Sequence, residues 1–72
     1  MLSVAEQTKI ILKRRNMTIA QLADKLNVSR QNLSNKLSRN NFDEKDIKAI
    51  AEALGCNADI VFIDKSSGEK IL

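Results

Sequence analysis

The sequence predicts a mainly α fold, with four short helices followed by a β-hairpin at the C-terminus. Four segments have apolar residues at helical spacing, and each follows a Ser, Thr or Asp suited to cap a helix. Asn or Gly residues that tolerate a left-handed conformation stand where several of these segments end. Residues 58–64 are instead rich in β-branched and aromatic side chains, which is typical of a strand.

The first predicted helix begins near Val4 and ends at Asn16. Ser3 and Glu6 form a capping box at its start, in which the side chain of each bonds the backbone N–H of the other. Ile10 points away from the apolar stripe of this helix. It is either a single exposed apolar residue or part of a surface for a partner protein.

Two further helices are predicted within residues 17–37, joined by a very short turn. Thr18 and Gln21 form a second capping box, at the start of the earlier helix. Asn27 suits the left-handed end of that helix, and Ser29 caps the later one. Their inner faces have apolar and small residues at helical spacing, namely Ile19, Leu22, Ala23, Leu26, Leu33 and Leu37. Two helices joined in this way form a helix-turn-helix, whose second helix enters the major groove of DNA.

The fourth predicted helix begins after Asp43 and ends at Gly55. Asp43 and Asp46 are suited to cap it, because acidic side chains complement the positive end of the helix dipole. Phe42 and Ile47 are spaced as a hydrophobic staple across its start. The apolar stripe of this helix is expected to close a core over the other helices.

The charge of the chain is unevenly divided. Residues 1–39 contain eight Lys or Arg and two acidic residues, a net charge of +6, whereas residues 40–72 have four Lys and seven acidic residues, a net charge of −3. The basic half contains the helix-turn-helix, as a surface that faces phosphates requires. A solvated basic face would have the same composition.

The composition argues against several classes of function. Cys56 is the single cysteine and His is absent, so we expect no disulfide, no metal ion, no nucleophile–His pair, no cofactor and no enzymatic activity. The chain has two Phe and no Trp or Tyr, which disfavours base stacking on single strands. No apolar run approaches the roughly 18–20 residues of a membrane span. We expect a cytoplasmic protein, with no membrane and no small-molecule substrate.

Residues 18–34 resemble the helix-turn-helix of the Cro/lambda-repressor family of prokaryotic and phage transcription regulators. The resemblance rests on the pairs Leu22-Ala23, Val28-Ser29 and Leu33-Ser34, and it extends over about residues 3–55. It implies a lambda-repressor-like four-helix DNA-binding domain, in a protein associated with the prokaryotic nucleoid. The chain departs from the family's pattern at a few positions, where Ile19 replaces a Gln that contacts phosphate, Asn27 a turn Gly, Lys36 an apolar residue and Leu37 an acid.

The later helix of the motif has an outer face rich in amides, where Lys and Glu would be ordinary. Asn, Gln and Arg side chains match base edges in the major groove, although a polar face with capping roles is the alternative. The residues expected to contact bases are Arg30, Gln31, Asn32, Ser34 and Asn35. Those expected to contact phosphates are Thr18, Ser29, Lys36, Arg39, Asn40 and Asn41.

The predicted C-terminal hairpin has two candidate registers. A three-residue loop, 66–68, pairs Lys65 with Glu69 and Asp64 with Lys70. A four-residue loop would place Asp64 opposite Glu69, and these side chains have like charges. We therefore predict the three-residue loop.

Both faces of this hairpin are apolar, and a two-stranded hairpin alone is marginally stable. One face is expected to pack on the helices. An identical chain is the simplest partner that could bury the other face. Both faces could instead be buried against the core of the same chain. The residues expected at the dimer interface are Ile60, Val61, Phe62, Ile63 and Ile71.

Residues 1–55 are thus predicted to form a DNA-binding domain and residues 56–72 a dimerisation element. The expected function is transcriptional repression by a homodimer that binds a two-fold operator in double-stranded DNA. An adaptor that kept the fold and lost DNA binding is one alternative, supported by Ile19. An antitoxin that binds both its operator and a toxin is another.

Overall fold

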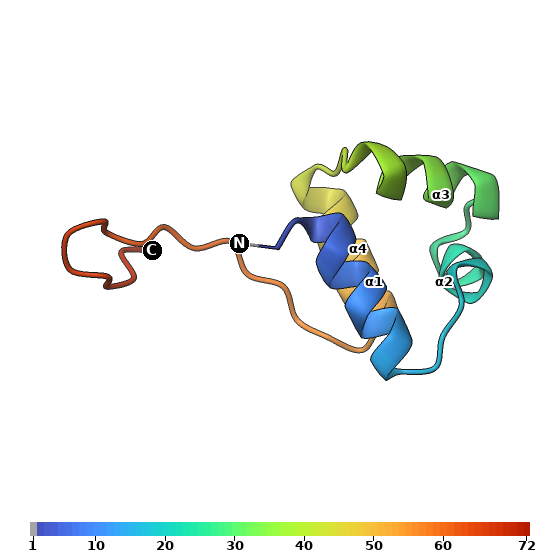
Figure 1. Ribbon diagram of the computed structural model, residues 1–72, viewed down its shortest axis with the longest axis horizontal. Coiled ribbons are helices and arrows are strands. Elements are labelled where there is room, and N and C mark those ends of the chain that lie inside the picture. Colours follow the sequence, from blue (N-terminus) through green and yellow to red (C-terminus); the bar gives the residue numbers. More distant parts are fainter. Residues whose placement is uncertain (1) are drawn as a thin grey trace.

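The computed structural model describes residues 2–72 and contains four helices. They are α1 (Val4–Arg14), α2 (Ile19–Leu26), α3 (Arg30–Arg39) and α4 (Glu44–Ala53). Figure 1 shows α1 in front of α4, with α2 and α3 beside them. The predicted mainly α fold with four helices is confirmed.

Side chains cap every helix at its N-terminus, as predicted. The capping boxes of α1, α2 and α4 begin at Ser3, Thr18 and Asp43. The Ser29 hydroxyl caps α3 by accepting the backbone N–H of Asn32 at 3.0 Å. These bonds satisfy N–H groups that have no partner inside a helix, so each helix begins where its cap stands.

Asparagines in the left-handed region lie at or just beyond the ends of three of the helices. Asn16, Asn27 and Asn40 have φ angles of 52°, 59° and 50°. Asn tolerates this conformation better than other residues with a Cβ, because its short side chain can bond locally. The predicted end at Asn27 is confirmed, because Asn27 is the C-cap of α2. Helix α1 ends at Arg14 with Arg15 as its C-cap, so the predicted Asn16 lies just beyond its end.

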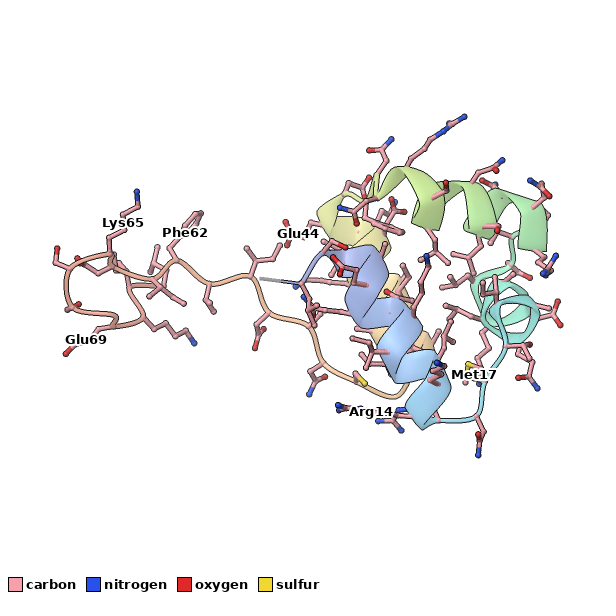
Figure 2. The ribbon with its side chains drawn as sticks, viewed as in Figure 1. Arg14, Met17, Glu44, Phe62, Lys65 and Glu69 are labelled. Atoms are coloured by element: carbon pink, nitrogen blue, oxygen red, sulfur yellow. The ribbon has the colours of Figure 1, made fainter. Side chains whose placement is uncertain are left out.

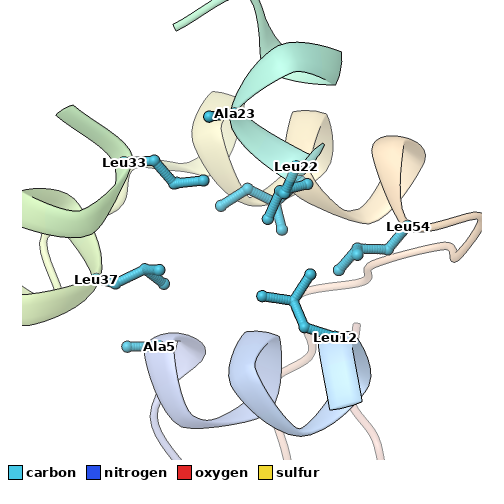
Figure 3. Close-up of a cluster of buried hydrophobic side chains, with 8 residues drawn as sticks. Ala5, Leu12, Leu22, Ala23, Leu33, Leu37 and Leu54 are labelled. Atoms are coloured by element: carbon cyan, nitrogen blue, oxygen red, sulfur yellow. The ribbon is translucent and has the colours of Figure 1, made fainter. Parts of the chain in front are cut away.

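The core is aliphatic and receives side chains from all four helices (Figure 3). Leu22 of α2 and Leu33 of α3 are 0% and 2% exposed. Ala23, 1% exposed, lies on α2, which packs against α3 and α4. A larger side chain at Ala23 would force these helices apart, because protein interiors have few voids.

The chain after α4, residues 56–72, is called here the C-terminal segment. It contains no β-strand among the described residues, so the predicted hairpin of two strands is wrong. A single antiparallel bridge joins Ile63 and Lys70. The Asp64 N–H donates to the Glu69 carbonyl oxygen at 2.8 Å, and the Gly68 N–H donates to the Asp64 carbonyl oxygen at 2.9 Å.

The predicted register is also wrong, because Asp64 lies opposite Glu69 around a four-residue turn. The Asp64 carboxylate bonds within the turn, where its Oδ1 accepts the backbone N–H groups of Ser66 at 2.8 Å and Ser67 at 3.2 Å. These N–H groups lower the pKa of Asp64. The turn thus stabilises the carboxylate, which offsets the like charge of Glu69.

The C-terminal segment extends away from the four-helix body, residues 3–55, and Phe62 lies far from the helices (Figure 2). Its large apolar side chains are exposed, with Phe62 at 67%. The molecule is 42 Å long but only 22 Å by 18 Å across. The expectation that one face of this segment packs on the helices is therefore wrong. The segment runs away from the helices, so they do not cover its large apolar side chains.

Candidate nucleic-acid interface

The outer face of α3 lies opposite the core. Leu33 and Leu37 are buried, so the positions on the other side of the helix point to solvent. Gln31 and Asn35 are exposed there, one turn apart, and Gln31 Nε2 donates to Asn35 Oδ1 at 3.2 Å. This bond leaves the carbonyl oxygen of Gln31 and the amino group of Asn35 for a further partner.

The other predicted base contacts differ in exposure. Arg30 and Asn32 are exposed beside the outer face, in the first turn of α3. Ser34 is half-buried, on the flank nearer the core. Ser38 is exposed one turn beyond Asn35 and continues the row of Gln31 and Asn35. The sequence prediction missed Ser38, although its spacing from these two residues could have revealed it.

The predicted phosphate contacts at the helix starts serve as caps in the free protein. Thr18 Oγ1 accepts the Gln21 N–H at 3.1 Å, and Ser29 Oγ caps α3. Both hydroxyls stay exposed at helix N-termini, where the helix dipole favours anions. Ile19, by contrast, is half-buried against the core and contributes packing.

Lys36 points toward α4 and forms an ion pair. Its Nζ lies 2.9 Å from Asp46 Oδ2, and the two side chains are 43% and 30% exposed. The hydrogen bond from Lys36, followed by the bond from the Asp43 N–H, lowers the pKa of Asp46. The ammonium predicted to contact a phosphate is therefore bound within the protein.

Asn40 also bonds within the protein. Its Oδ1 accepts the backbone N–H of Ala5 at 3.0 Å and so joins the end of α3 to the start of α1. Arg39 and Asn41, its neighbours in the chain, have exposed side chains. The structure thus places Gln31 and Asn35 together on the outer face of α3. Lys36 and Asn40 bond to other parts of the chain.

Among residues 2–72, no three Asp, Glu or Cys side chains gather closely enough to hold a metal ion. None of the helices in the same range is both long and apolar enough to cross a bilayer.

Comparison with known families gives one match. A model of the helix-turn-helix family of Cro/C1 type matches residues 9–61, which contain α2, α3 and α4 completely. No curated protein and no solved structure gave a match. The match covers more than half of the chain and includes the whole outer face of α3.

Proposed function

Because this chain belongs to the helix-turn-helix family of Cro/C1 type, a family of DNA-binding transcription regulators, we propose that it binds specific duplex sequences as a repressor. The observation that carries the proposal is the outer face of α3. It combines amides, a guanidinium and hydroxyls on a short helix fixed by buried leucines. These groups match base edges in the major groove.

Gln31 and Asn35 are the central base contacts in this proposal. They lie one turn apart and already bond each other, so the pair is ordered before DNA arrives. Each amide can bond N6 and N7 of an adenine together. Arg30 and Asn32 extend the contacts across the first turn, while Ser34 and Ser38 flank the row.

The phosphate contacts surround that face. The exposed polar groups near the ends of α2 and α3 belong to Thr18, Ser29, Arg39 and Asn41. Lys36 and Asn40 are left out of this set because they already bond Asp46 and Ala5. Phosphate contacts release counterions, so affinity for any duplex should fall steeply with salt.

A second copy of the chain is the proposed partner of the C-terminal segment. The proposed interface residues of this segment are apolar and exposed, namely Ile60, Val61, Phe62, Ile63 and Ile71, and Leu72 beside them is exposed as well. Pairing two such segments about a two-fold axis would bury these side chains. A domain of this size has a small core, and oligomerisation commonly supplements it.

Selection of bound sequences from a random duplex pool tests the proposal. We expect a two-fold symmetric site with half-sites about one helical turn apart, roughly 34–36 Å. Repression would then follow from occlusion of a promoter. A pool that shows no enrichment, with no affinity for duplex DNA at low salt, would reject DNA binding by this chain.

Binding of a different protein is the second candidate function. Two observations favour it, namely the packing role of Ile19 and the exposed apolar side chains of the C-terminal segment. An adaptor would bind a protein partner without any affinity for DNA. An antitoxin would bind both DNA and a toxic partner, which would co-purify with it.

A further inference from the structure

The ion pair between Lys36 and Asp46 lies beside the outer face of α3. Lys36 follows Asn35 directly and stands one turn after Asn32. Its four-carbon side chain is long enough to turn toward either α4 or a phosphate beside the helix. The structure has it turned toward α4, with Nζ 2.9 Å from Asp46 Oδ2.

Asp46 is held in place from two directions. Its Oδ2 accepts the backbone N–H of Asp43 at 3.2 Å, and its own N–H donates to Asp43 Oδ1 at 2.7 Å. The carboxylate is therefore fixed to the first turn of α4 by the capping box before it bonds Lys36. The hydrogen bond from Lys36, followed by the bond from the Asp43 N–H, lowers the pKa of Asp46, so it is charged at neutral pH.

The ion pair lies at a space between α3 and α4 that side chains do not fill. A pocket of about 160 Å³ opens there, and its walls include Val28, Leu33, Phe42 and Ile50 together with Lys36 and Asp46. Packing alone therefore leaves this flank of α3 incompletely supported. The ion pair links the two helices across the pocket.

We propose that Asp46 is a positioning residue that holds Lys36 away from DNA phosphates and fixes this flank of α3. This inference rests on the proposed function. Phosphate contacts are the same for every sequence, whereas base contacts depend on the placement of α3. Asp46 would thus raise the ratio of operator affinity to affinity for unrelated DNA.

The test compares Asp46→Asn with Glu44→Gln in the full chain. Asn keeps an oxygen that can accept the Asp43 N–H, so the cap remains while Lys36 is released. Glu44 lies in the same turn of α4, and its nearest ion-pair partner is Lys48 at 3.8 Å. Both variants remove one negative charge, but only Asp46→Asn removes the ion-pair partner of Lys36.

The affinity of each variant is measured on a selected operator and on scrambled duplex between low and high salt. In Asp46→Asn the released lysine should steepen the salt slope on scrambled DNA by about 0.9, so that affinity falls about 3.5-fold more than in wild type between 50 and 200 mM salt. The ratio of operator to scrambled affinity should fall. Adding Lys36→Gln to Asp46→Asn should remove the steeper slope on scrambled DNA.

Three results would overturn the inference. Asp46→Asn could leave both the slope and the ratio unchanged, or Glu44→Gln could produce the same change, which would make the effect one of net charge. Wild-type protein that binds no duplex would overturn the proposed function itself, and the inference with it. Wild-type binding with an unresponsive Asp46→Asn variant would reject the inference alone.

A further variant keeps the test decisive should Asp46→Asn fail to fold. Lys36→Gln breaks the ion pair from the other side and is expected to lower the ratio of operator to scrambled affinity. Its salt slope on scrambled DNA should match that of wild type, because Lys36 does not reach a phosphate in the proposed complex. A shallower slope would overturn the inference, since Lys36 would then be a phosphate contact.

Discussion

The four-helix body and the C-terminal segment both contain large apolar residues, but the body buries them and the segment leaves them exposed. In the body, the leucines of four helices close on one another, and Leu22 and Leu33 are almost completely buried. In the segment, one bridge orders the backbone while the side chains around Phe62 stay exposed. The difference indicates that the body buries its core within one chain, whereas the segment leaves its apolar side chains open to a second surface, as the proposed dimer would supply.

The largest expected effect is in the body. Leu22→Ala removes the centre of the core and should cost about 2–5 kcal/mol in the free energy of unfolding. Small cores supply only about 3–5 kcal/mol, so the variant should be largely unfolded. Denaturant unfolding followed by circular dichroism measures this loss. A cooperative transition with the wild-type midpoint would mean that the body does not depend on this core.

The next expected effect is on assembly. Phe62→Ser should weaken the proposed dimer by about 2 kcal/mol or more, because aromatic residues dominate most interfaces. The helical content of the chain should not change, since Phe62 lies outside the core. Sedimentation of the variant beside wild type measures the dissociation constant. A wild-type chain that is monomeric at every concentration would remove the proposed role of the segment.

Ending the chain after Gly55 sharpens the same comparison. The shortened chain should be a monomer with the helices intact, or a monomer of reduced stability, because all core leucines precede this residue. Sedimentation and thermal unfolding would distinguish these results. A shortened chain that still forms dimers would show that the dimer interface lies in the helical body.

A smaller effect is expected where α3 meets α1. Asn40→Gly keeps the left-handed backbone but removes the oxygen that accepts the Ala5 N–H. Asn27→Gly is the matched control, because Asn27 is also left-handed and its side chain is exposed. The loss in unfolding free energy should be about 1 kcal/mol greater for Asn40→Gly. Equal losses would show that the bond to Ala5 contributes nothing measurable.

The smallest effect concerns pH. The bond from Lys36 lowers the pKa of Asp46 in the folded protein. The pair therefore stabilises the fold above the pKa of an unfolded aspartate, and this contribution is lost as pH falls through the lowered pKa. It amounts to at most about 1 kcal/mol because both side chains are partly exposed. Asp46→Asn should accordingly reduce the acid sensitivity of unfolding, which denaturant titrations between neutral and acidic pH would measure.

The helices of the body could be predicted because their signals are local. A cap such as Ser29 and a left-handed residue such as Asn27 lie within a few positions of the helix end that each determines. The outer face of α3 follows from the same spacing, which places Gln31 and Asn35 opposite the buried leucines. Sequence periodicity contains this information without any knowledge of tertiary contacts.

The features that could not be predicted depend on contacts between distant residues or on side-chain direction. Lys36 bonds Asp46 of another helix, and Asn40 bonds Ala5, which lies 35 residues earlier in the sequence. The register of the C-terminal segment depends on the Asp64 carboxylate, which bonds the turn instead of facing Glu69. The predicted register paired opposite charges across the hairpin, which assumes that these side chains project from its faces. The Asp64 side chain instead turns into the loop.

The most direct test of the proposal that α3 reads DNA sequence is the affinity of Gln31→Ala for a selected operator and for scrambled duplex. Gln31 is exposed on the outer face and makes its only side-chain bond within the described residues to Asn35, so the fold should tolerate this change. The operator affinity should fall by about 1–3 kcal/mol per contact, with preference relaxed at one symmetric pair of positions. Affinity for scrambled DNA should change little. Equal losses on the two duplexes would contradict base contact by Gln31 and the assignment of the outer face.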